Sequence, residues 1–231
     1  MRAARPVIWA VAAVTGFLVL AACGDGRKPD GAQTPPQRAG TSSGLGSARF
    51  RAIDAVYVAS LPIDRFQANR TVDPDAFAGA TRPAIAACDA LDRDDPLLGA
   101  VARMCPLVLR FSEQLLRVGP CADADAARCI GVVDEMQGTV ASYKRLGRRS
   151  DRVIARAELK PACQKALTTP ALAYEVFDGY ARALVLLERG LTNGAAGDVE
   201  QAQRVLTRSA AKGRELPDAK ESLALFRSGC A

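Results

Sequence analysis

Apolar residues recur every three or four positions over long stretches of the chain, and charged residues occupy the positions between them. One such series follows Pro96 and consists of Leu97, Val101, Met104, Val108, Phe111 and Leu115. A second series follows Pro170 and consists of Ala173, Val176, Phe177, Tyr180, Leu184 and Leu187. Because this spacing matches the roughly 3.6 residues of a helical turn, each stretch is predicted to be an amphipathic helix with one buried face.

Capping residues and helix breakers occur between these series. Asp73-Pro74, Asp95-Pro96 and Thr169-Pro170 each place a capping side chain before a proline at the first helical position. Gly119-Pro120 and Asn193-Gly194 are typical of helix ends. The predicted helices span 48–68, 74–91, 96–118, 124–157, 170–190, 198–212 and 217–228.

The predicted fold class is all-α. No stretch shows sustained alternation of apolar and polar residues with β-branched side chains, as a strand would. Pro62 is a candidate kink in the first helix, and Gly147 is a candidate break in the fourth. We expect residues 48–231 to form a single helical-bundle-like domain of about six or seven helices, since this length suffices for one hydrophobic core.

Residues 1–22 have the pattern of an export signal. Arg2 and Arg5 precede an apolar run from Val7 to Leu20, which is shorter than the about 20 residues that a membrane-spanning helix needs. The run ends in Leu20-Ala21-Ala22-Cys23, which resembles the bacterial lipobox. The resemblance implies cleavage before Cys23, lipidation of Cys23 and anchoring in the bacterial cell envelope. An ordinary signal peptide with a chance cysteine is the alternative.

The segment after Cys23 is predicted to be a tether. Residues 24–47 are rich in Gly, Pro, Ser and Thr, so with Cys23 they form a lipidated, flexible segment over 23–47. A flexible chain of these 24 residues has an r.m.s. span of about 27 Å. By resemblance to enterobacterial lipoproteins, Gly24 in place of aspartate favours the outer membrane, facing the periplasm, in a Gram-negative host.

The remaining cysteines are expected to form a disulfide framework, because their even number fits an exported domain. They are Cys88, Cys105, Cys121, Cys129, Cys163 and Cys230. A zinc site is disfavoured, since the chain has neither a Cys-x-x-Cys pair nor a histidine. If Cys121 and Cys129 shared one helix, about 12 Å of rise would prevent their pairing, and a bridge would require a non-helical segment. Cys163 with Cys230 is the expected closure of the C-terminal half.

The composition excludes several kinds of catalysis. The chain is 49% hydrophobic and 24% charged, and it has no histidine, which rules out Ser-His and Cys-His nucleophiles and imidazole-ligated zinc or haem. The acidic group Asp89, Asp92, Asp94 and Asp95 lacks the spacing of a calcium loop and is interpreted as turn and cap chemistry. Nothing selects one carboxylate pair among the 25 acidic residues. We therefore predict no catalytic residue, no metal and no cofactor, and a protein that is not an enzyme.

Positive charge is concentrated in residues 144–160. This segment holds the basic residues Lys144, Arg145, Arg148, Arg149, Arg152, Arg156 and Lys160. Removal of the signal would lower the net charge from +6 to +4, so the segment accounts for the whole excess of positive charge.

Four of these arginines share one face of the predicted helix. Arg145, Arg149, Arg152 and Arg156 are spaced by four, three and four residues. They are the candidate contact for an anionic partner, because a clustered cationic face attracts phosphate groups, acidic polymers and acidic proteins. The alternative is a solvated face in which Asp151 and Glu158 act as local counter-charges.

Residues 121–146, CADADAARCIGVVDEMQGTVASYKRL, resemble the C-terminal part of LprI-type lysozyme-inhibitor domains, which are small, helical, disulfide-bonded exported modules. The wide spacing of the two cysteines and the lack of a tryptophan before them depart from that family, so no inhibitory residue is transferred. The predicted function is a membrane-anchored, non-catalytic binding module for a protein or anionic envelope partner rather than nucleic acid, for example an inhibitor or immunity-type protein against an envelope-directed enzyme. The alternative is an envelope assembly or scaffold lipoprotein whose basic face docks on phospholipid or a membrane complex.

Overall fold

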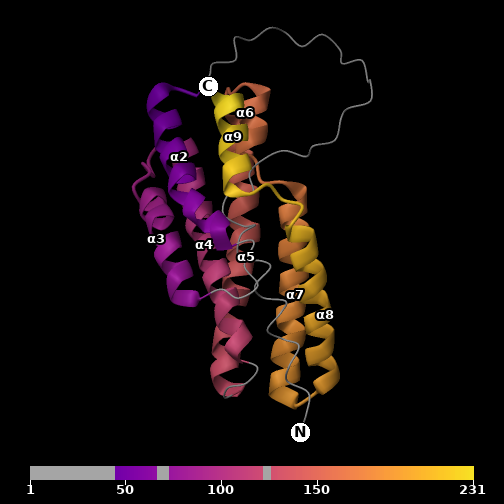
Figure 1. The fold of residues 1–231 in the computed structure, drawn as a ribbon. Helices are drawn as coiled ribbons and strands as arrows, with labels where there is room; N and C mark the ends of the chain where they lie inside the picture. Colours follow the sequence, from indigo (N-terminus) through magenta and orange to yellow (C-terminus); the bar gives the residue numbers. More distant parts are fainter. Residues whose placement is uncertain (1–44, 67–72, 122–125) are drawn as a thin grey trace, which may run out of the picture.

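The computed structural model describes residues 45–66, 73–121 and 126–231, and these residues are all-α, as predicted (Figure 1). The elements are α2 (Ser47–Ser60), the 3-10 helix η1 (Leu61–Phe66), α3 (Pro74–Asp89), α4 (Pro96–Cys121), α5 (Ala126–Arg156), α6 (Pro161–Leu167), α7 (Ala171–Asn193), α8 (Ala196–Gly213) and α9 (Ala219–Cys230). None of the helices in these ranges is long and apolar enough to cross a bilayer. The expected signal peptide, Cys23 and most of the tether lie outside the described residues.

The two longest helices, α4 and α5, form the centre of the molecule (Figure 1). Helices α2 and α3 cover one side of this pair, and the hairpin of α7 and α8 covers the other. Helices α6 and α9 pack against each other at the end where α5 finishes. Among the described elements, α8 packs only on α7, so α7 separates it from α5.

Aromatic side chains fill the space between α4, α5 and α7. Tyr143 stacks on Phe177 with ring centroids 3.7 Å apart, and Phe111 lies 4.9 Å from Phe177 and 5.0 Å from Tyr180. All four rings are buried. The apolar faces predicted after Pro96 and Pro170 therefore do face the core, where burial of each large side chain stabilises the fold by about 1.5–3 kcal/mol.

Most of the predicted helix ends are confirmed. Asp73 accepts a hydrogen bond from the Asp75 N–H at the start of α3. Asp95 accepts bonds from the N–H groups of Leu97 and Leu98 at the start of α4. Gly194 ends α7 with φ of 66°, a left-handed conformation that favours glycine.

Two predicted ends are wrong. Pro170 is itself the residue before α7, in an extended conformation, and Thr169 does not cap the helix with its side chain. The Thr169 N–H instead donates to Asp151, which ties the start of α7 to α5. The second wrong end is that of α4, which continues through Gly119 and Pro120 to Cys121 instead of stopping at residue 118.

The expected break at Gly147 does not occur, and α5 is one continuous helix. A Cβ at this position would lie 2.5 Å from the Tyr174 hydroxyl oxygen and 3.2 Å from Cε of Met104. Close packing against these two side chains, and not a turn, therefore accounts for Gly147. The expected kink at Pro62 is a change from α-helix to the 3-10 helix η1. Helix α6, with seven residues, was not predicted.

Two disulfides connect the described helices. Cys163 of α6 is bonded to Cys230 of α9, as expected, with their Cα atoms 4.4 Å apart. Cys88 and Cys105 join α3 to α4 with a Cα separation of 6.1 Å. Cys121 and Cys129 fall on two different helices, so the 12 Å argument against their pairing does not apply. Cys129 is buried on α5, and of Cys121 only the backbone, at the end of α4, is described.

Candidate functional site

The four predicted arginines form one exposed line on α5. Because α5 is continuous, Arg145, Arg149, Arg152 and Arg156 share a flank of the helix, and all four are exposed. We call these four residues the arginine column. None of them forms an ion pair or a side-chain hydrogen bond with another residue in the part of the chain that the structure describes. From Arg145 to Arg156 the column rises by about 16 Å.

The other basic residues of the predicted segment behave differently. Lys144 forms an ion pair with Asp178 of α7. Lys160 donates a hydrogen bond of 2.7 Å to the main-chain oxygen of Ala231. These two lysines are bonded to neighbouring elements, whereas the arginines of the column are not. Arg148 is exposed beside the column.

Asp151, one of the two counter-charges of the solvated-face interpretation, is bonded toward α7 and forms no ion pair with the column. One of its carboxylate oxygens accepts a bond of 2.9 Å from the Thr169 N–H, and the other accepts a bond of 2.6 Å from the Tyr174 hydroxyl. Burial, and then the nearby Asp151 carboxylate, raise the pKa of Tyr174 well above its ordinary value. The Tyr174 hydroxyl therefore stays protonated and remains a donor to Asp151 at any ordinary pH.

An open hollow lies next to the arginine column, between the end of α5, α6 and the start of α7. Its volume is about 610 Å³. Arg152 and Ala155 line it from α5, Gln164 and Lys165 from α6, and Thr168 and Thr169 from the connection to α7; Asp151 is its one acidic lining residue. The hollow is wide open to solvent, so a group bound there would stay largely exposed.

A second, more enclosed cavity of about 50 Å³ lies between α2, α4 and α5. Its lining is mainly apolar and includes Ile53, Val108 and Ile154. The Ser150 hydroxyl at its wall donates to the carbonyl oxygen of Ala100. No carboxylate lines this cavity, and the hollow has only Asp151, so neither space holds the two carboxylates that a glycosidase-like mechanism needs.

The acidic group at residues 89–95 serves the turn between α3 and α4. Asp89 pairs with Arg93 at 3.0 Å, and the Asp92 carboxylate accepts a bond from the Asp94 N–H. Asp95 caps α4 and also binds Arg49 at 2.6 Å. Across residues 45–66, 73–121 and 126–231, no three Cys, Asp or Glu side chains gather as ligands for a metal ion.

The comparisons with known proteins add no relative. No family model matches the chain, and neither a curated protein nor a solved structure matches it. The likeness to the lipobox and the likeness to LprI-type domains therefore stay predictions from the sequence.

Proposed function

We propose that this protein is a membrane-anchored, extracytoplasmic lipoprotein that acts as a non-catalytic binding module, and that the arginine column contacts its anionic partner. The main observation behind the proposal is that the basic residues of α5 differ in whether they are bonded to other residues of the fold. Lys144 is bonded within the fold, whereas all four arginines of the column are exposed and form no bond with any described residue.

The residue type supports a recognition role. A guanidinium group presents a planar fork of donors that matches carboxylate and phosphate groups, and it stays charged at every ordinary pH. The continuous helix fixes the spacing of the four side chains, while each unbonded guanidinium group still loses rotamer freedom when a partner binds. Helix α5 is held on both sides, by α4 and by α7, which supports a surface of fixed shape.

The described side chains also favour binding over catalysis. The hollow beside the column has one carboxylate, and both of its oxygens are already bonded to Thr169 and Tyr174. The smaller cavity is mainly apolar. A nucleophile activated by histidine is excluded because the chain has none.

The proposed module has one specific form and one rival. In the specific form it is an inhibitor or immunity-type protein that binds an envelope-directed enzyme, a role that needs a stable fold on a tether near the target of that enzyme. Two disulfides support such stability. In the rival form it is an assembly or scaffold lipoprotein whose basic flank docks on phospholipid or on a membrane complex.

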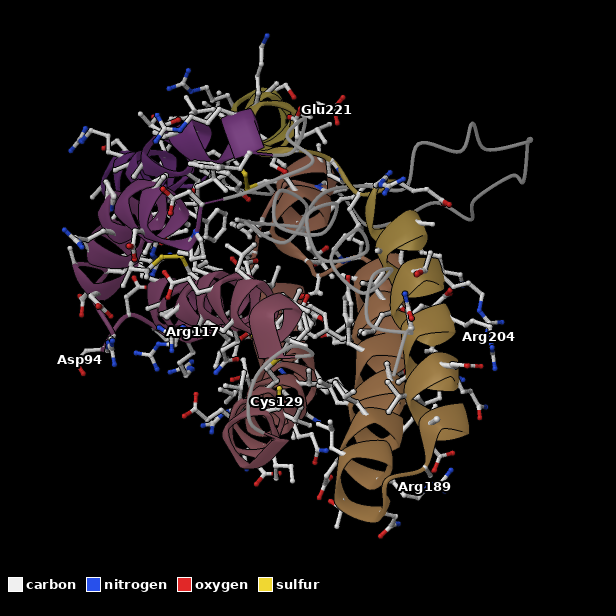
Figure 2. The ribbon with its side chains drawn as sticks, turned by 60° about the horizontal axis from the view of Figure 1, so that its bottom comes forward. Asp94, Arg117, Cys129, Arg189, Arg204 and Glu221 are labelled. Carbon is white, nitrogen blue, oxygen red and sulfur yellow. A yellow bond between two sulfur atoms is a disulfide. The ribbon has the colours of Figure 1, made fainter. Side chains whose placement is uncertain are left out.

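The proposal is tested by affinity capture from envelope and secreted fractions of the host. The bait is the full mature chain with oxidised cysteines, compared with a variant in which Arg149→Glu and Arg152→Glu reverse half of the column. A matched control places the same two changes on α8, Arg204→Glu with Arg208→Glu. Arg204 projects from the outer side of α8, away from α5 (Figure 2).

We expect the wild type and the α8 control to capture the same anionic partner, and the column variant to lose it. Equal capture by all three proteins would show that the column is a solvated helix face, and the proposed site would be wrong.

A further inference from the structure

The arginine column reaches the end of the fold at which the chain enters from its N-terminal segment. Phe50 at the start of α2 stacks on Phe226 near the end of α9, with centroids 5.0 Å apart. The end of α9 is in turn bonded to the segment after α5, through Lys160 and Ala231. Figure 1 shows α6 and the C-terminus of α9 together at this end. A tether anchored at Cys23 would therefore join the fold close to Arg156.

The charge of the exposed flank changes sign along α5. Its C-terminal half presents the arginine column and Arg148, whereas its N-terminal half presents Asp134 and Glu135, both exposed. A uniformly negative surface would attract the first half and repel the second. The half that it attracts is the one nearer to the expected anchor.

The hollow lies beside this basic half. Arg152 lines it from α5 and Lys165 lines it from α6, whereas the Thr168 hydroxyl already donates to the Gln164 carbonyl oxygen and the Thr169 side chain is hydrogen-bonded to Tyr174. Asp151 also lines the hollow; its two oxygens accept bonds from the Thr169 N–H and the Tyr174 hydroxyl, and it remains a negative charge beside Arg152.

The column has no apolar anchor next to it. Protein interfaces depend on buried aromatic or aliphatic side chains at their centres. In the described ranges the exposed large apolar residues are Val58, Val185 and Leu225, which belong to α2, α7 and α9. A basic surface without apolar anchors is suited to the head groups of a bilayer, because an anionic lipid surface attracts basic side chains without burying apolar ones.

From these observations we infer that the C-terminal half of α5, together with α6, docks on anionic phospholipid, with Arg152 and Arg156 among the side chains that face the head groups. The inference rests on the proposed function, because it names the anionic partner of the same column. The lipid anchor would hold the protein at the membrane, and the column would fix which side of the helical domain faces the bilayer.

The test is arginine footprinting on the full lipidated protein in vesicles. A dicarbonyl reagent modifies accessible guanidinium groups, and mass spectrometry gives the modification rate of each arginine. Vesicles of phosphatidylglycerol with phosphatidylcholine are compared with vesicles of phosphatidylcholine alone, so that anchoring is the same in both. Arg204 on α8 is the internal control in every sample.

In the anionic vesicles we expect Arg152 and Arg156 to react about fivefold more slowly, the factor that corresponds to the attraction of one basic side chain to an anionic surface. Arg204 should react at the same rate in both kinds of vesicle. Added salt should remove the protection, since surface charges are screened within about 10 Å at 0.1 M.

Two results would overturn the inference. One is an equal rate for Arg152 in both kinds of vesicle. The other is full protection of Arg152 by inorganic phosphate without vesicles, which would indicate a small-anion site instead of a docking surface. If these results occurred while the column variant still lost a captured protein, the phospholipid inference alone would fail and the proposed function would stand.

Discussion

The two flanks of α5 differ in what their polar side chains do. On the flank toward α7, Gln137 bonds Glu188, Lys144 pairs with Asp178, and Asp151 accepts bonds from two groups. On the opposite flank the arginine column has no described partner. Since both flanks belong to one continuous helix, the difference lies in the side chains and not in the backbone.

The comparison separates stability from recognition. The flank of α5 that faces α7, the inner flank, is expected to contribute to the free energy of unfolding, because its groups are buried or bonded. The flank with the arginine column, the outer flank, is expected to contribute little, because exposed charges without partners do not hold elements together. The following predictions test this separation, from the largest expected effect to the smallest.

The largest effect is expected for Phe177→Ala, which removes the ring stacked on Tyr143 from a fully buried position. The variant should lose about 3–5 kcal/mol in free energy of unfolding, because both transfer energy and a cavity contribute. Urea denaturation followed by circular dichroism measures it. A loss below about 1 kcal/mol would mean that α7 is not packed on α5 as described.

A smaller loss is expected for Asp151→Ala. The change removes the acceptor of the Thr169 N–H and the Tyr174 hydroxyl and should cost about 1–3 kcal/mol, the usual range for hydrogen bonds to a charged group. The matched control is Arg152→Ala, the next residue along the helix, which should change the free energy of unfolding by no more than about 0.5 kcal/mol. Equal losses in the two variants would contradict the division of α5 into an inner and an outer flank.

Gly138→Ala is expected to stabilise the protein. Gly138 is an exposed residue within α5, and a Cβ there would meet no atom within 4 Å. Alanine should therefore add about 0.5–1 kcal/mol through helix propensity, and it should leave partner capture unchanged. Thermal unfolding of the two proteins under the same conditions gives the comparison. A destabilised variant would show that this part of the outer flank is covered.

The smallest effect concerns the exposed pair of Asp54 and Arg227, which joins α2 to α9. Hydrogen bonds of 2.7 and 3.0 Å from the Arg227 guanidinium lower the pKa of Asp54 below its ordinary value of 3.8. Because the pKa is lower in the folded state, the pair contributes stability at neutral pH and loses it as the pH falls through the folded pKa. The wild type should therefore be more stable than Asp54→Asn at neutral pH, and the difference in unfolding free energy should shrink as the pH falls below about 4. A difference that grows in acid would contradict the prediction.

Much of the fold follows from local sequence patterns. The series after Pro96 and Pro170 predict α4 and α7 because their apolar residues face one core, and Asp73 and Asp95 mark helix starts because they bond nearby N–H groups. Helix α6 was missed, since seven residues give too few turns for a periodic signal. Its position depends on packing against α9 and on the disulfide between Cys163 and Cys230.

The site was predicted only in part. The spacing of the four arginines is a local property of one helix, so their common flank could be derived from the sequence alone. The role of Asp151 could not, because its partners Thr169 and Tyr174 are 18 and 23 residues away in the chain. The hollow likewise depends on where α6 and the start of α7 lie against α5, and no short motif encodes that arrangement.

The central claim is that the arginine column serves binding and not folding. The most direct test compares two proteins, the double variant Arg149→Glu/Arg152→Glu and the single variant Phe177→Leu, and measures thermal unfolding and partner capture for each. The arginine variant should keep the thermal midpoint of the wild type and lose the partner. Phe177→Leu should lower the midpoint and, well below that midpoint, still capture the partner. If the arginine variant instead unfolded early and bound normally, the arginine column would be part of the framework of the fold and the binding role would be contradicted.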